Sequence, residues 1–273
     1  FGNCLWAFYN HELFDDIHKK RVRLKSASTG RSYTEEEVLA PLTEYDIPHE
    51  TVSFKKVAEL LAEGNVVGWF QEGSEFGPRA LGCRSILADS REAKFRDIVN
   101  DKVKHRESFR PFAPAILEER ASDFFDLDCL SPFMLLIARV KKPETIPSVS
   151  HVDNTARVQT VSQKENAPFY SLISEFEKQT GVPVLMNTSF NVAGEPIVET
   201  PRDALICSFG TDMDYLVLHN KLIDCKLKGR DKIRGKMIAD RDRDVTTWRK
   251  QALERNHPGY NDQEKDLLIF LRF

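Results

Sequence analysis

The chain has 273 residues, of which 41% are hydrophobic and 30% charged, and its formal net charge is −3. This length suits one large domain or two small ones, and the composition is that of a globular protein with a normal core. The small negative charge excludes a general electrostatic attraction to nucleic acid or acidic membranes, so a cationic site has to be local.

The sequence shows no clear signal for a membrane span, a signal peptide or a disulfide framework. No run approaches the roughly 18 apolar residues of a membrane span, and the first residues lack a signal-peptide layout. Because residue 1 is Phe1 rather than Met, we expect the numbering to begin inside a longer protein. The five cysteines are far apart and form no Cys-x-x-Cys pair, which indicates neither a disulfide framework nor a zinc site. A cytoplasmic protein is expected.

In chain order, residues 1–45 are interpreted as the end of a missing upstream domain plus a linker, 46–229 as the main domain, and 230–273 as a charged extension with an apolar end. Thr34 follows a Ser/Thr/Gly-rich stretch and predicts a capped helix start. A helical face before Gly64 predicts a second helix. The predicted strands are 65–70, 85–88, 132–140, 156–161, 182–186 and 215–219, and further predicted helices are 92–103, 167–179 and 201–209. Strands that alternate with helices indicate an α/β fold.

Two segments in the first half place cationic groups beside glycine or proline turns. Residues 75–85 have glycines around a loop that carries Arg79, whose planar fork of donors suits an anion. Residues 102–112 are basic, contain aromatic residues, and include Lys104 and Arg110. From residue 79 to residue 110 there are nine Lys and Arg against five Asp and Glu, so positive charge is concentrated here.

Two later segments have a related character. Residues 151–159 place Arg157 at the start of an apolar strand, where an unpaired charge would be costly. Residues 183–196 form a buried strand that opens directly into Asn187 and Ser189. Ligands of open α/β sheets bind just beyond strand ends, so amide and hydroxyl groups would meet a ligand there.

Together the four segments favour phosphoryl chemistry, which depends mainly on positioning and on neutralising charge. Each residue also has an ordinary structural explanation. A single arginine such as Arg79 or Arg110 is most often a surface ion-pair partner, and Lys104 could simply complement a helix end. No phosphate-loop, His-x-x-x-His or Gly-x-Ser-x-Gly motif is present.

For the later segments the alternatives are equally concrete. Arg157 could form a buried structural ion pair with Asp153 or Asp89. Asn187 and Ser189 could be turn formers, since short polar side chains hydrogen-bond to their own backbone. The sequence pattern alone leaves these alternatives open.

Motifs in all four segments closely resemble the C-terminal domain of the NodU/CmcH/TobZ O-carbamoyltransferases, in family order, from about residue 32 to about residue 222. The motifs are Phe-Gly-Pro-Arg-Ala-Leu-Gly with Arg-Ser-Ile-Leu-Ala (76–88), Phe-Arg-Pro-Phe-Ala-Pro (109–114), Thr-Ala-Arg-Val-Gln-Thr-Val (155–161), and Asn-Thr-Ser-Phe-Asn with Gly-Glu-Pro-Ile (187–197).

The resemblance implies a YrdC-like fold, with a twisted, mostly mixed β-sheet and flanking helices. It implies that carbamoyl phosphate and ATP, with Mg²⁺, give carbamoyl-adenylate, and that an absent N-terminal kinase-like domain with an iron-binding histidine pair transfers the carbamoyl group to a hydroxyl. No metal site is expected in this chain itself. Arg79, Arg110 and Lys104 are the implied catalytic residues, and the implied substrate-binding set is Arg79, Lys104, Arg110, Arg157, Asn187 and Ser189.

Three other functions stay open at this stage. A YrdC-like nucleotide- or RNA-binding module would also use a basic face. A threonylcarbamoyl-adenylate-type synthase would use bicarbonate and threonine in place of carbamoyl phosphate. A purely structural domain would have lost the site, although Arg79, Lys104, Arg110 and Arg157 are all retained. A second copy of the chain is a further candidate partner.

Overall fold

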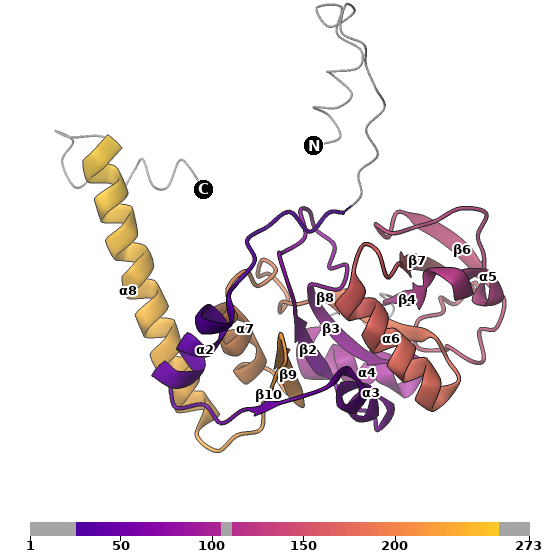
Figure 1. Ribbon diagram of the computed structural model, residues 1–273, viewed down its shortest axis with the longest axis horizontal. Coiled ribbons are helices and arrows are strands. Elements are labelled where there is room, and N and C mark those ends of the chain that lie inside the picture. Colours follow the sequence, from indigo (N-terminus) through magenta and orange to yellow (C-terminus); the bar gives the residue numbers. More distant parts are fainter. Residues whose placement is uncertain (1–25, 105–110, 257–273) are drawn as a thin grey trace, which may run out of the picture.

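The computed structural model describes residues 26–104 and 111–256, with side chains up to residue 247. Within these residues ten strands form one sheet (Figure 1). They are β1 (Glu50–Thr51), β2 (Val67–Phe70), β3 (Arg84–Asp89), β4 (Ala113–Leu117), β5 (Phe125–Asp126), β6 (Leu136–Val140), β7 (Thr155–Val161), β8 (Val184–Ser189), β9 (Tyr215–Leu218) and β10 (Lys221–Asp224). Their order across the sheet is β1-β10-β9-β2-β3-β8-β4-β7-β6-β5.

The sheet is mixed. β2 pairs with β9 in parallel and β4 pairs with β7 in parallel, whereas the other neighbouring strands are antiparallel. The helices are α2 (Glu35–Glu44), α3 (Phe54–Ala62), α4 (Lys94–Val99), α5 (Ala121–Phe124), α6 (Ala167–Thr180), α7 (Pro201–Phe209) and α8 (Arg230–Asn256), with a π-helical turn at Asn100–Lys104 and a 3₁₀ turn at Glu118–Arg120. The predicted α/β class and mixed sheet with flanking helices are confirmed.

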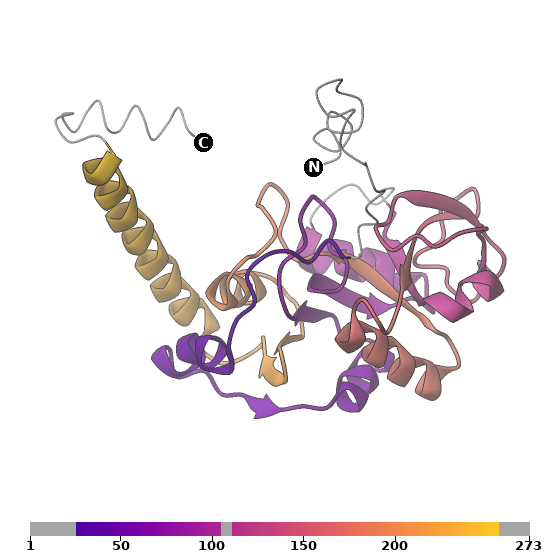
Figure 2. The ribbon, with the colours of Figure 1, turned by 45° about the horizontal axis from the view of Figure 1, so that its top comes forward.

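Helices cover both faces of the sheet (Figure 2). α3 and α6 pack on one face, where Leu61 and Phe176 meet Trp69 and Leu185 in one buried cluster. α2, α4 and α7 lie on the other face, whose larger cluster includes Phe95. Residues are fully buried on both faces because strands that lie between two helical layers have no solvent side.

Local signals explain why the predicted helices are correct. The Asn166 side chain accepts a hydrogen bond from Phe169 N at the start of α6, and Gly181 ends that helix with a φ of 75°. Thr34 begins α2 and Thr200 begins α7, each in a capping box. These side chains satisfy backbone donors that have no partner inside the helix, which is the physical basis of the sequence signal.

Two predicted elements differ in extent. The helix predicted for 92–103 is a short α-helix that continues as a π-helical turn, and the strand predicted for 132–140 begins only at Leu136. The segment before Leu136 instead folds over the sheet, where the buried side chain of Met134 packs against Leu81 and Ala113. Apolar residues in a covering loop resemble strand residues, which explains the second difference.

α2 and the first part of α8 meet beside α7, where Tyr45 Oη donates to Asp240 and Arg202 of α7 pairs with Glu44 and Asp244. Val38 and Leu42 of α2 belong to the same core as the sheet, and so does Met237 of α8, although the sequence analysis assigned these residues to a linker and an extension. Beyond this contact α8 projects away from the rest of the molecule in both views (Figures 1 and 2). A search of the described helices for a stretch that could cross a membrane finds none.

Candidate functional site

The four segments singled out in the sequence come together at one edge of the sheet. β8 runs antiparallel to both β3 and β4, and β4 runs parallel to β7. The C-terminal end of β8 therefore lies beside the N-terminal ends of β3, β4 and β7 (Figure 1). Ser189 is opposite Ser85, and Asn187 is opposite Ala113. We call this group of strand ends the β8 edge.

Two arginines at the β8 edge, Arg79 and Arg157, have no carboxylate partner within the described part of the chain. Burial lowers the pKa of half-buried Arg157, and the nearby Arg79 lowers it further. Arg157 Nε is buried without a hydrogen-bond partner, and among residues 26–104 and 111–247 neither arginine forms an ion pair. Two neighbouring cations repel each other, so an anion bound between them would be favoured.

The structural ion pair considered for Arg157 is not formed. Asp89 is bound by Arg91, with 2.6 Å between Arg91 Nη2 and Asp89 Oδ2. Asp153 accepts hydrogen bonds from the backbone and hydroxyl of Thr155. Both carboxylates are thus occupied elsewhere, so neither of them neutralises Arg157.

Asn187 supports the loop that carries Arg79. Its side chain is 1% exposed, and its Nδ2 donates to Gln159 Oε1 at 2.7 Å and to Ala80 O at 3.2 Å. Gln159 Nε2 in turn donates to Leu81 O at 2.7 Å. Asn187 Oδ1 is buried without a partner. The strand-end amide is therefore more than a turn former, since it connects β8 to the loop.

Lys104 ends the π-helical turn Asn100–Lys104 and contacts the turn that follows β8. Its buried ammonium donates to Ser189 O at 2.6 Å and Asn191 O at 2.8 Å, and it also contacts Ser189 Oγ and Asn191 Oδ1. The structure thus brings Lys104 and Ser189 together, and these contacts fix the shape of the turn. Whether Lys104 also faces ATP phosphates stays a prediction. Arg110 lies outside the described residues.

Sequence reasoning missed two polar residues that build this edge, Glu75 and Gln159. Both bind backbone groups of the Arg79 loop. A carboxylate or amide that binds backbone produces no charge pattern or spacing. The signal that was present is a polar residue, Gln159, within an otherwise apolar strand, because buried polar groups are almost always hydrogen-bonded.

Two cavities lie near these elements. One of about 570 Å³ is lined by Arg96, Pro111, Ser148, Ser150, His151, Val152 and Asp153. It adjoins the β8 edge, because Pro111 precedes β4 and His151 precedes β7. Arg96 Nε is buried there without a hydrogen-bond partner, although it lies 3.7 Å from Asp97 Oδ1 in an ion pair, so its charge is already partly balanced.

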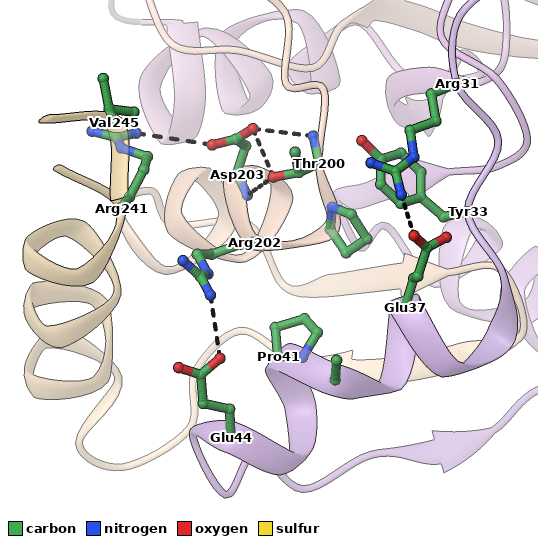
Figure 3. Close-up of a pocket in the computed structure, with 12 residues that line it drawn as sticks. Arg31, Tyr33, Glu37, Pro41, Glu44, Thr200, Arg202, Asp203, Arg241 and Val245 are labelled. Carbon is green, nitrogen blue, oxygen red and sulfur yellow. Dashed lines mark hydrogen bonds and ion pairs between the residues drawn. The ribbon is translucent and has the colours of Figure 1, made fainter. Parts of the chain in front are cut away.

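The other cavity, about 470 Å³, lies between α2, the start of α7 and α8 (Figure 3). Its three arginines are each paired, with Arg31 on Glu37, Arg202 on Glu44 and Arg241 on Asp203. Because the charges are already balanced, this cavity has no cation left over for an anion. It is therefore a poorer candidate for phosphate chemistry than the β8 edge.

Away from the β8 edge, His219 is a partly buried residue whose protonation is linked to folding. It occupies the tight turn between β9 and β10 with a φ of 53°. Burial lowers its pKa, and so does Arg84, whereas Glu72 and Glu35 act in the opposite direction. Arg84 is fully buried and stacks on Phe70, 3.6 Å from the ring centroid. A second cation beside Arg84 is unfavourable, so burial and Arg84 together favour the neutral form of folded His219.

We therefore expect acid to weaken the fold through His219. The unfolded chain binds a proton near the usual histidine pKa of about 6.5, whereas the folded chain resists it. Its contribution to stability is present above that pH and is lost as the pH falls toward the lowered folded pKa. His219→Asn suits the left-handed turn and should lose less unfolding free energy than the wild type between neutral and mildly acidic pH in urea titrations. An equal loss would contradict this account.

No group of three or more His, Cys, Asp or Glu suited to a metal ion occurs in the part of the chain that the structure describes.

Comparison with known proteins identifies relatives over this same region. A family model described as "Carbamoyltransferase C-terminus" matches residues 58–225, which include all four segments. "Uncharacterized protein sll1178" of Synechocystis sp. is 47% identical over 247 residues, covering 80% of this chain and 40% of that protein. "Nodulation protein NolO" of Bradyrhizobium diazoefficiens is 47% identical over 190 residues, covering 68% of this chain and 35% of its own length.

A third relative has a chemical name. "3'-hydroxymethylcephem-O-carbamoyltransferase" of Amycolatopsis lactamdurans is 42% identical over 151 residues, covering 55% of this chain and 29% of that enzyme. Among solved structures, full-length HypF in its phosphate- and nucleotide-bound form gives a TM-score of 0.43 at 17% identity, over 65% of this chain and 23% of that one. The chain thus spans well under half the length of the three curated relatives named here.

Proposed function

Since this chain belongs to the carbamoyltransferase C-terminus family, we propose that it converts carbamoyl phosphate and ATP to carbamoyl-adenylate at the β8 edge. The upstream part of the longer protein then transfers the carbamoyl group to a hydroxyl acceptor. The observation that carries this proposal is the pair of neighbouring arginines, Arg79 and Arg157, neither with a carboxylate partner in the described chain.

The proposed reaction has two steps. Water cleaves carbamoyl phosphate to carbamate and inorganic phosphate, and a carbamate oxygen then attacks the α-phosphorus of ATP as pyrophosphate leaves. Both steps concentrate negative charge on phosphate oxygens, which guanidinium groups stabilise through paired hydrogen bonds. Arg79 and Arg157 would hold these oxygens, and Arg110 and Lys104 are assigned to the same task by resemblance. Mg²⁺ that arrives with ATP would supply further charge neutralisation.

The experiment is ATP–pyrophosphate exchange in the longest native protein. We expect labelled pyrophosphate to enter ATP only when carbamoyl phosphate is present. Exchange supported by bicarbonate and threonine would instead favour the threonylcarbamoyl-adenylate reaction. If neither substrate set supports exchange, the proposed activation step is wrong. Binding to RNA with a steep salt dependence would favour the binding-module alternative.

A surface beside the arginine pair suits the proposed upstream domain. Ile137 is opposite Arg157 in the sheet and is 66% exposed, while Leu135 is 75% exposed and Phe76 is 70% exposed. Phe76 N donates to Ala27 O, and Ala27 and Phe133 both pack against the small cluster of Leu81, Ala113 and Met134, so the Phe76 loop and the segment before β6 meet at that cluster. Exposed apolar groups gathered in one place indicate an interaction surface, and a labile mixed anhydride needs a nearby acceptor domain.

We expect this surface to be covered in the longer protein. In hydroxyl-radical footprinting, Leu135 and Ile137 should be labelled strongly in the 273-residue chain and several-fold less when the upstream region is present. Ile137→Asp should restore the labelling of Leu135. Val152 is fully exposed on a different loop, so its labelling, and the effect of Val152→Asp, provide the matched control. Equal labelling of Leu135 in both proteins would rule out this docking surface.

A further inference from the structure

The loop that carries Arg79 returns to the sheet through an irregular stretch in which backbone groups from Ala80 O to Arg84 N are hydrogen-bonded. Few of these bonds are to other backbone groups. Side chains from four places supply most of them, namely Trp69, Glu75, Gln159 and Asn187. Because a buried irregular backbone needs a partner for each polar group, these side chains determine the path of the loop.

Glu75 makes the largest contribution. Its Oε1 accepts hydrogen bonds from Leu81 N at 2.6 Å, Cys83 N at 2.8 Å and Arg84 N at 3.3 Å. Its other oxygen, Oε2, is buried without a partner, and no ion pair involving Glu75 occurs among residues 26–104 and 111–247. A carboxylate bound by backbone amides forms charge-assisted bonds. Glu75 therefore connects the outgoing limb of the loop to its returning limb.

The outgoing limb is fixed as well. Ser28 pairs with Glu75 in an isolated bridge, Phe76 N donates to Ala27 O at 2.7 Å, and Gly30 N donates to Ser74 O at 2.9 Å. Both limbs are thus held, and the exposed tip at residues 76–79 ends in Arg79. The bonds at the base of the loop therefore fix the backbone from which the Arg79 side chain extends.

We propose that Glu75 is a positioning residue, whose carboxylate holds the loop so that Arg79 stands beside Arg157 ready to bind a phosphate. This role rests on the proposed function, although Glu75 itself does not contact substrate. The negative charge is required because only a carboxylate oxygen can bind three amide donors strongly.

The test combines kinetics with amide exchange in the full chain and in the longest native protein. Glu75→Ala should lower the rate of carbamoyl phosphate-dependent ATP–pyrophosphate exchange by about 10²-fold, because a shift of about 1 Å in a positioned group has that effect. Glu75→Gln keeps one acceptor oxygen and should lose only about 10-fold. In an Arg79→Ala background, Glu75→Ala should cause less than about a 3-fold further loss, since residues that act through one another are not additive.

Hydrogen–deuterium exchange supplies a readout that needs no activity. The amides of Leu81, Cys83 and Arg84 should exchange at least several-fold faster in Glu75→Ala, and Glu75→Gln, which keeps the fold, should show a smaller increase. Unchanged hydrogen–deuterium exchange of these amides in Glu75→Ala would overturn the role of Glu75. It would also be overturned if the losses of ATP–pyrophosphate exchange in Glu75→Ala and Arg79→Ala were fully additive. If the amides exchange faster in Glu75→Ala but the wild-type protein shows no ATP–pyrophosphate exchange, the role of Glu75 in holding the loop is supported and only the proposed function is rejected.

Discussion

Arg157→Ala is expected to lower carbamoyl phosphate-dependent ATP–pyrophosphate exchange by about 10²–10³-fold, the usual loss when one charge-stabilising donor is removed. Arg157 is half-buried, its Nε has no partner, and no carboxylate of the described chain neutralises it. A side chain that is kept charged and unpaired beside another cation makes no contribution to the ionic stability of the fold. We therefore expect its contribution to be to binding and to the transition state.

The same argument predicts the stability of the variant. Removal of a half-buried, unpaired cation relieves its repulsion with Arg79, so the melting temperature of Arg157→Ala should be unchanged or higher. Arg157→Lys keeps the charge but not the two-pronged donor geometry, so it should recover only part of the rate. If Arg157→Ala instead unfolds the protein while Arg157→Lys is fully active, the arginine has a structural role.

Gly82→Ala should have the largest effect on stability, about 3–5 kcal/mol, because two independent costs combine there. Gly82 has a φ of 104°, which side chains rarely adopt. An added Cβ would overlap the ring of Phe169 and lie 2.9 Å from Asn166 Nδ2. Phe169 is fully buried and has no space to move away. Urea unfolding would measure this loss.

Gly77 provides a control within the same loop. Its φ of 123° is equally unusual, but an added Cβ would meet nothing within 4 Å. Gly77→Ala should therefore show the backbone cost alone, about 1–2 kcal/mol. Similar losses for both variants would mean that Phe169 does not limit the loop. A small loss for Gly82→Ala would mean that the returning limb can follow another path.

The sequence predicted those parts of the fold that are marked by local chemistry. The predicted helices 167–179 and 201–209 correspond to α6 and α7, and the structure shows Asn166, Thr200 and Gly181 as the caps that begin or end them. β4 was missed, since all five of its residues are buried and one is a proline, so it shows neither alternation nor a turn signal. β10 is a short strand that completes a hairpin with β9. It was also missed, because its four residues are too few to show a recognisable alternation of apolar and polar residues.

The candidate site was predictable as a set of segments but not as an arrangement. Strand order depends on pairings between residues far apart in the chain, and nothing in the motifs shows that β8 lies between β3 and β4. The individual roles also depend on neighbours. Asn187 was predicted to line a ligand pocket, and the structure shows its amide bound to Gln159 and the backbone of Ala80.

The pairing of β2 with β9 has a consequence for synthesis of the protein. β2 ends at Phe70, whereas its parallel neighbour begins only at Tyr215. While the ribosome translates the intervening chain, the growing polypeptide presents an apolar strand with one unsatisfied edge, the kind of template on which nascent chains aggregate. We expect productive folding to wait until the Tyr215–Leu218 strand has emerged, so that premature termination before this strand gives insoluble rather than partly active protein.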